Sequence, residues 1–274
     1  MRVVRELRGR VTLRALTASP ARIPELRAAG ITPVVGNLDE PRSLARLAGL
    51  ATRLVHLAPP ATEHSGAWWR DFRTLSLMRV LSRRQRPVSV VYASTSGVYG
   101  DCAGERVLEW RTPQPRTPRA QRRLDAEKVM RHFGRRGPRV SILRVPGIYA
   151  ADRPGGARER LQRGSPVLVA SDDVYTNHIQ ADDLARALIS GVWRGAPQRA
   201  YNVCDDTELK LGDYFDLVAD MHGMPRPRRV SRAVAADELS LSVLSFMDES
   251  RRLVNQRLKT ELRLRLRHRT ILER

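Results

Sequence analysis

A cluster of hydroxyl side chains at residues 94–96 (Ser-Thr-Ser) directly follows an apolar run at residues 88–93. If that run is a strand of a parallel sheet, Thr95 lies at its carboxyl end, where open α/β sheets bind their ligands. A threonine hydroxyl there could hydrogen-bond to an oxygen of a bound small molecule. Hydroxyl groups at strand ends also often satisfy nearby backbone groups, and this second interpretation of Thr95 stays open.

Two arginines, Arg119 and Arg123, are four residues apart in the predicted helix at residues 118–133 and therefore share one helix face. A guanidinium does not release its proton near neutral pH, so neither side chain can serve as a general acid or base. A pair of arginines at a cleft could instead bind a carboxylate or phosphate. Together with Arg122, the two could equally form a solvated basic stripe.

Strand-like and helix-like segments alternate through the first half of the chain. Apolar or alternating runs predict strands at residues 11–17, 31–35, 53–57, 88–93 and 140–145, and helices fill the intervals at 22–29, 41–48, 68–81 and 118–133. This alternation predicts an α/β fold with a doubly wound parallel sheet and helices on both faces. Later segments predict helices at 182–193 and 211–221, a strand at 200–204, and an edge strand at 262–267, where Leu and Arg alternate.

Four segments together resemble the extended short-chain dehydrogenases/reductases, the NAD(P)-dependent epimerase/dehydratase family. They lie at residues 88–101, 139–149, 175–184 and 199–204. The resemblance places Thr95 at the catalytic Ser/Thr position, and Arg119 and Arg123 where the family has the Tyr and Lys of its Tyr-x-x-x-Lys pair. It implies a Rossmann-like NAD(P)-binding domain at residues 1–150 and a smaller substrate-side lobe at 151–274, interleaved with the sheet.

The resemblance also implies which residues contact the cofactor. An Arg near the end of the second family strand, in place of the Asp that binds NAD ribose, favours NADP over NAD, although Arg22 could equally be one surface arginine among many. Residues 37–39 resemble the segment that meets the adenine, and Asp39 could also cap a helix. The full set of implied cofactor contacts is Thr17, Arg22, Asn37, Leu38, Asp39, Ala58, Pro59, Thr95, Arg123, Pro146 and Tyr149.

The beginning of the chain departs from the family pattern. Dinucleotide-binding folds open with a strand and a glycine-rich turn that approaches the pyrophosphate at a helix N-terminus. No such motif precedes residue 11, and residues 1–9 resemble the end of the first helix. We therefore expect the sheet to lack its first strand and glycine loop. A start at an internal Met would explain this, and a protein that truly lacks the loop is the alternative.

Composition limits the remaining function classes. The chain has 274 residues, a net charge of +20 and two widely separated cysteines, Cys102 and Cys204, so we expect reduced thiols, no metal site and a cytoplasmic location. No apolar run approaches the roughly 20 residues that span a bilayer, and we expect no membrane association. The basic residues are dispersed and few aromatics accompany them, which disfavours a dedicated nucleic-acid site. A homodimer is compatible with these features.

Two functions fit these observations. One is an NAD(P)-binding epimerase/dehydratase-like oxidoreductase that acts on a sugar nucleotide or another carbonyl or hydroxyl compound, using Thr95 and a non-standard acid. The other is a non-catalytic protein that senses dinucleotides or binds a partner. Retention of Thr95 favours the first function, and replacement of the Tyr and Lys by Arg119 and Arg123 favours the second.

Overall fold

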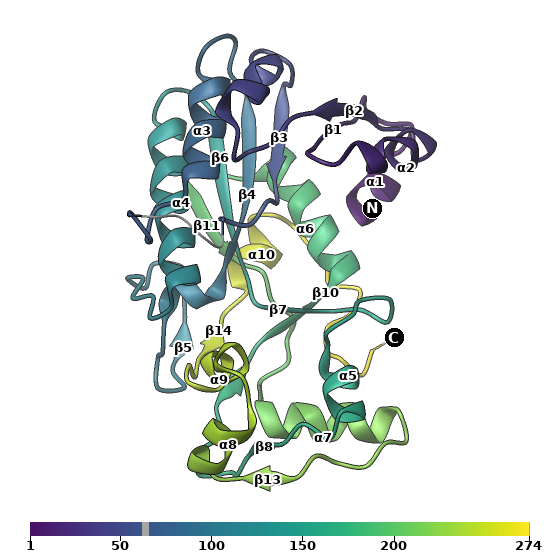
Figure 1. Ribbon diagram of the computed structural model, residues 1–274, viewed down its shortest axis with the longest axis vertical. Helices are drawn as coiled ribbons and strands as arrows, with labels where there is room; N and C mark the ends of the chain where they lie inside the picture. Colours follow the sequence, from purple (N-terminus) through teal and green to yellow (C-terminus); the bar gives the residue numbers. More distant parts are fainter. Residues whose placement is uncertain (62–65, 274) are drawn as a thin grey trace.

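The computed structural model describes residues 1–61 and 66–273, with a parallel sheet as its centre (Figure 1). Its four strands are ordered β11-β6-β4-β3 and all run parallel. They span β3 (Arg53–His56), β4 (Ser89–Thr95), β6 (Arg139–Val145) and β11 (Arg199–Asn202). The predicted α/β fold with a parallel sheet is confirmed.

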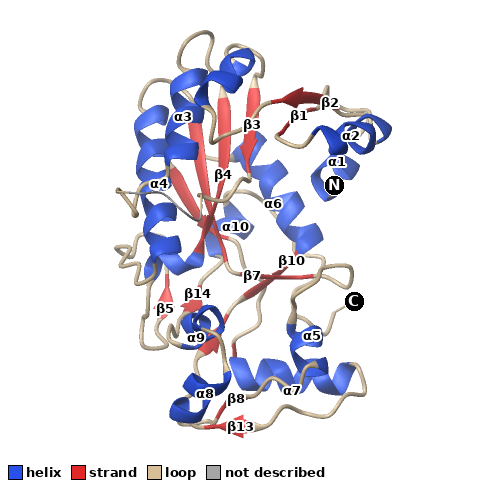
Figure 2. Cartoon of the chain, in the orientation of Figure 1, coloured by secondary structure: helices blue, strands red, loops and turns tan. Residues whose placement is uncertain are grey.

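The two faces of the sheet are buried by different helices. Val90 and Tyr92 of β4 pack toward α3 (Phe72–Leu81) and α4 (Pro118–Gly134), whereas Val91 packs toward α6 (Ala181–Arg194). This alternation is the period of two expected for a strand with both faces covered. The helices α1 (Arg2–Leu7) and α10 (Gln256–Thr260) lie on the same side as α6 (Figure 2).

The first two strands form a separate pair. The strands β1 (Arg14–Thr17) and β2 (Thr32–Val35) are parallel to each other, and α2 (Ile23–Ala28), with the 3-10 turn η1 (Pro20–Arg22), connects them. Within the described residues this pair is not hydrogen-bonded to β3, so β1 and β3 each keep one edge without a strand partner. The expected absence of a first strand and glycine loop stays a prediction.

A second lobe lies beyond the carboxyl end of the sheet (Figure 1). Its core includes Leu168, Phe215 and Met247. Its elements are α5 (Ala157–Gln162), β8 (Val167–Leu168), α7 (Leu211–Met221), β13 (Arg229–Val230), α8 (Arg232–Glu238) and α9 (Leu241–Met247). Because α6, β11 and α10 return to the sheet, residues 151–274 contribute to both parts. No helix in the described part of the chain is long and apolar enough to cross a membrane.

Short pairs of strands connect the two parts. The pair β7 (Gly147–Tyr149) and β10 (His178–Gln180) is parallel, as is β5 (Arg106–Val107) with β14 (Arg252–Leu253). The pair β9 (Tyr175–Thr176) and β12 (Leu209–Lys210) is antiparallel. Two further 3-10 turns are η2 (Pro41–Leu47), where the sequence predicts a helix, and η3 (Ser96–Tyr99).

The predicted edge strand at residues 262–267 is wrong, because the structure has no strand there. Leu262 and Leu264 are nevertheless buried against α6 and α10, and the arginines between and beside them face solvent. The alternation of Leu and Arg correctly indicates which side chains are buried. It does not require a ladder of backbone hydrogen bonds, and an extended segment without strand pairing produces the same burial pattern.

Candidate functional site

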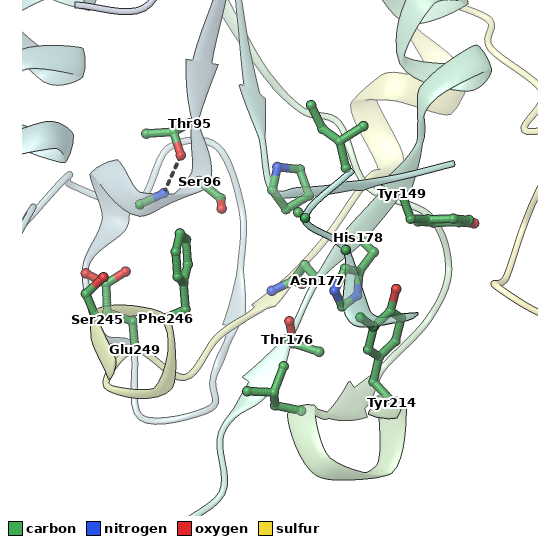
Figure 3. Close-up of a pocket in the computed structure, with 18 of the residues that line it drawn as sticks. Thr95, Ser96, Tyr149, Thr176, Asn177, His178, Tyr214, Ser245, Phe246 and Glu249 are labelled. Carbon is green, nitrogen blue, oxygen red and sulfur yellow. Dashed lines mark hydrogen bonds between the residues drawn. The ribbon is translucent and has the colours of Figure 1, made fainter. Parts of the chain in front are cut away.

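A pocket of about 390 Å³ lies between the carboxyl end of the sheet and the second lobe. Residues after β4, at the start of α4, around β7 and β10, on α5 and α7, and at the end of α9 form its walls. Figure 3 shows Thr95, Phe246 and Glu249 on one side of this space and Tyr149, His178 and Tyr214 on the other. A ligand in the pocket would therefore contact both parts of the protein.

Thr95 is the last residue of β4 and lines the pocket. Its Oγ1 accepts a hydrogen bond of 3.3 Å from the backbone N–H of Gly97, which leaves the hydroxyl proton available to a ligand (Figure 3). The following turn depends on Gly100, which has a φ of +68° and where a Cβ would lie 2.1 Å from the carbonyl oxygen of Gln114. The turn therefore requires glycine, and it holds Thr95 at the edge of the pocket.

A buried polar network supports the strand end beneath Thr95. Ser94 donates a 2.6 Å hydrogen bond to Oε1 of Glu127 on α4, and Arg144 of β6 donates to both carboxylate oxygens of Glu127 at 3.1 and 2.8 Å. The side chains of Arg144 and Glu127 are only 3% and 2% exposed. This network couples α4 to β4 and β6, and so sets the position of Arg119 and Arg123 relative to the sheet.

Arg119 and Arg123, both on α4, have different surroundings. Arg123 donates to the carbonyl oxygen of Ala93 at 2.7 Å and to the Tyr92 hydroxyl at 3.2 Å, and it is not among the residues that line the pocket. Its charge also affects buried His56, whose pKa is lowered to about 4, mainly by burial and further by Arg123. Arg123 therefore holds α4 against β4, and its predicted role toward a cofactor stays untested.

Arg119 does line the pocket. Its guanidinium lies 4.9 Å from the centre of the Phe246 ring, and within the described residues it makes no hydrogen bond. Burial in the pocket wall lowers its pKa, and the charge of Arg123 adds to this effect. A guanidinium stacked on an aromatic ring keeps the N–H groups at its edge available, so Arg119 is suited to bind an anionic oxygen next to Thr95.

Glu249 is a pocket residue that the sequence patterns did not predict. One carboxylate oxygen, Oε2, accepts a 2.7 Å hydrogen bond from Arg251, which also donates to the carbonyl oxygen of Gly100 at 2.8 Å. The other oxygen, Oε1, is buried and has no partner within the described residues. Among the described lining residues Glu249 is the sole carboxylate. Only its position in a polar stretch, between Ser245 and the two arginines 251–252, could have indicated it.

The opposite wall is built on His178, which stacks on Tyr214 with ring centres 3.7 Å apart. Burial lowers the pKa of His178 to about 3, so the ring is neutral, and its buried Nδ1 has no partner in the described part of the chain. Next to it, burial raises the pKa of Asp205 to about 7 and raises the pKa of Tyr149. Tyr149 and Pro146 both line the pocket, as does Thr95, and these three cofactor candidates are thus brought together.

The other cofactor candidates lie outside this pocket. Arg73 links two of their loops, because it pairs with Asp39 at 2.5 Å and donates to the carbonyl oxygen of Pro59 at 3.1 Å. Arg22 is exposed and pairs with Glu25 at 3.3 Å. The candidates outside the pocket are Thr17, Arg22, Asn37, Leu38, Asp39, Ala58, Pro59 and Arg123, and their roles stay predictions.

Comparisons with known proteins agree with this architecture. The chain is 28% identical over 162 residues to the GDP-6-deoxy-D-mannose reductase of Pseudomonas aeruginosa, a match that covers 54% of this chain and 53% of that protein. The chain thus spans about half the length of this curated relative. A conserved protein of unknown function from Silicibacter pomeroyi has a similar structure, with a TM-score of 0.79, 25% identity and coverage of 98% and 90% of the two chains.

A second solved structure is RMD from Pseudomonas aeruginosa in complex with NADPH. Its TM-score is 0.67 at 22% identity, and the match covers 91% of this chain and 92% of that one. The family model described as "NAD dependent epimerase/dehydratase family" matches residues 3–204, well over half of the sequence. The chain therefore belongs to the NAD dependent epimerase/dehydratase family.

Proposed function

We propose that this protein binds a nicotinamide dinucleotide and acts on a hydroxyl or carbonyl carbon of a sugar nucleotide or a related small molecule. The observation that carries the proposal is the position of Thr95, whose hydroxyl lies at the carboxyl end of β4 in a pocket shared with Pro146 and Tyr149. Membership of the family, a solved neighbour in complex with NADPH and a curated relative named GDP-6-deoxy-D-mannose reductase all support it.

The residues present fit the nicotinamide end of the cofactor. Pro146 and Tyr149 surround the same space as Thr95, and the aromatic stack of His178 on Tyr214 forms an apolar wall opposite. A bound nicotinamide dinucleotide would supply the capacity to accept or donate a hydride. Arg22, the last residue of the 3-10 turn η1 that follows β1, supports a preference for NADP, because an arginine in this region can bind the 2′-phosphate. Its exposed pair with Glu25 leaves N–H groups available for that contact.

Proton transfer needs a group other than Arg119. Glu249 is the candidate, because a carboxylate can both accept and return a proton and its Oε1 has no partner in the described part of the pocket. Arg119, which lines the same pocket, would stabilise the developing negative charge on the reacting oxygen, and Thr95 would donate a hydrogen bond to that oxygen. This division of roles assigns each of the three side chains a function that its chemistry permits.

The test compares cofactor binding with turnover in the purified protein. NADPH, NADH and their oxidised forms are titrated first, and turnover is then followed by the absorbance of the reduced nicotinamide with a panel of GDP- and UDP-sugars. We expect Thr95→Ala to lower turnover by about a hundredfold or more, as for loss of a donor to a reacting oxygen, and to lower cofactor affinity much less, because Thr95 is one of several cofactor candidates. Thr95→Ser should retain most of the activity. Equal turnover in wild type and Thr95→Ala would refute the assigned role.

The alternative function is a dinucleotide-sensing or partner-binding protein without catalysis. The hydrogen bonds of Arg123 to β4 favour this non-catalytic function, because the side chain donates to Ala93 and Tyr92 instead of lining the pocket. Tight binding of a dinucleotide with no turnover on any substrate, unaffected by Thr95→Ala, would support the alternative over the enzyme.

A further inference from the structure

The lobe side of the pocket contains an arginine without an acidic partner. Arg160 of α5 lines the pocket, and its guanidinium lies 4.5 Å from the centre of the Phe215 ring on α7. Within the described residues its buried Nη2 has no hydrogen-bond partner, and no carboxylate forms an ion pair with it. Because a polar atom withdrawn from water without a partner is costly, this half-buried guanidinium with its buried Nη2 indicates a ligand group that the protein does not itself supply.

Carboxylates of the surrounding lobe form ion pairs with other arginines. Glu159, the acidic residue on α5, pairs with Arg163 at 3.7 Å. Three of the four aspartates at and beside α7 face Arg229, at 3.8, 3.7 and 2.6 Å; they are Asp173, Asp213 and Asp216. The fourth, Asp220, pairs with Arg226 at 2.7 Å. The lobe thus contains enough acids to neutralise Arg160, but the fold directs them away from it.

The electrostatics of Arg160 agree with this picture. Burial lowers its pKa to about 10, and the charge of Arg163 adds to the effect. The side chain is still cationic at neutral pH. Stacking on Phe215 occupies the face of the guanidinium, so the N–H groups at its edge are directed sideways, in the geometry that binds two oxygens of one anion.

The whole pocket favours an anion. Four arginines line it, and the sole carboxylate among the described lining residues, Glu249, pairs with Arg251. The other three, Arg119, Arg153 and Arg160, have no carboxylate within ion-pair distance in the described part of the chain. Arg119 lies on the sheet side with Thr95, whereas Arg160 belongs to the lobe.

We propose that Arg160, stacked on Phe215, binds an oxyanion of the ligand, a phosphate or a carboxylate, at the lobe side of the pocket. This deepens the proposed function and rests on it, because the site lies in the same pocket and selects substrates that carry an anionic group away from the reacting carbon. Arg160 is in this sense a specificity residue that contacts the substrate at a distance from Thr95.

The experiment measures anion binding without cofactor or turnover, so its failure is separate from failure of the proposed enzyme. Inorganic phosphate, succinate and UDP are titrated into wild type by calorimetry, at constant ionic strength set with sodium chloride so that unspecific surface attraction is screened. The variants are Arg160→Gln, Arg160→Lys and, as a matched control on the same helix, Arg158→Gln. Arg158 is exposed and lies outside the pocket.

We expect phosphate or succinate to bind wild type and Arg158→Gln equally, and Arg160→Gln about tenfold more weakly or worse, as for loss of a hydrogen-bonded charge. Arg160→Lys should be intermediate, since an ammonium cannot bind two oxygens side by side. Binding of UDP together with phosphate identifies a nucleotide as the source of the anion, and binding of succinate alone identifies a carboxylate. Equal affinity of Arg160→Gln and wild type for all three anions would overturn the proposal.

Thermal unfolding of the same variants, in chloride and in phosphate, distinguishes a loss of anion binding from a loss of folding. Loss of the Phe215 stack can lower the melting temperature of Arg160→Gln in chloride, so the quantity compared is the rise in melting temperature when phosphate replaces chloride. This rise should be equal in wild type and Arg158→Gln and smaller in Arg160→Gln; an equal rise in all three would count against the proposal.

Discussion

The buried ion pair between Glu127 and Arg144 allows a quantitative test of what positions Thr95. Glu127→Gln keeps the shape of the side chain but removes its charge, which leaves the Arg144 guanidinium buried without an opposite charge. Arg144 donates two hydrogen bonds to Glu127 and Ser94 donates a third, and the amide can accept only part of these. Breaking one partner of such a pair costs about 3–5 kcal/mol of the free energy of unfolding.

The assay is urea unfolding followed by circular dichroism, with thermal unfolding as a second measurement. A loss of this size lowers the melting temperature by about 10 °C for a chain of this length. Glu159→Gln is the matched control, because its pair with Arg163 is exposed and should contribute less than about 1 kcal/mol. If Glu127→Gln were within about 1 kcal/mol of wild type, the pair would not hold α4 against the sheet, and the reasoning that places Arg119 by this network would fail.

The backbone at Gly100 and the titration of His178 each give a further prediction. Gly100→Ala should destabilise the protein by about 2–4 kcal/mol in thermal or urea unfolding, since its φ of +68° and the 2.1 Å approach to Gln114 exclude a Cβ; an unchanged melting temperature would contradict this. His178 has a folded-state pKa of about 3 against an ordinary 6.5, so the unfolded chain takes up the proton first. Stability due to this residue is present above about pH 6.5 and is lost toward pH 3, by about 1.4 kcal/mol per pH unit. His178→Phe, which keeps the stack on Tyr214, should weaken this acid dependence, and an identical pH profile would refute the assignment.

The sheet was predictable because its strands are buried on both faces. Such strands appear in the sequence as short apolar runs, as at residues 88–93 and 140–145, and parallel strands separated by helices imply the layered arrangement. The same pattern predicts the position of Thr95, because the apolar run at residues 88–93 gives way to hydroxyl residues where the strand ends. Residues 262–267 show the limit of this reasoning, because burial on alternate sides does not depend on strand pairing.

Glu249 and Arg160 were not predictable in the same way. Each lies in a segment whose local pattern indicates only a short helix or loop, and each reaches the pocket because the lobe folds back over the sheet. Whether an arginine lacks a carboxylate partner depends on which residues the fold brings near it. Arg160 has no carboxylate partner in the described residues, whereas three aspartates from two segments of the lobe converge on Arg229, and no local sequence pattern indicates that convergence.

The spacing of Arg119 and Arg123 shows why one helix face can still serve two purposes. The two are one helical turn apart, and β4 ends beside that turn: Arg123 lies next to the Ala93 carbonyl, within the strand, whereas Arg119 lies near the pocket beyond the strand end. The cation that anchors the helix is therefore distinct from the one that faces the ligand. A substitution of Arg123 should thus affect mainly stability and a substitution of Arg119 mainly ligand binding, and urea unfolding together with ligand titration of the two variants would distinguish these effects.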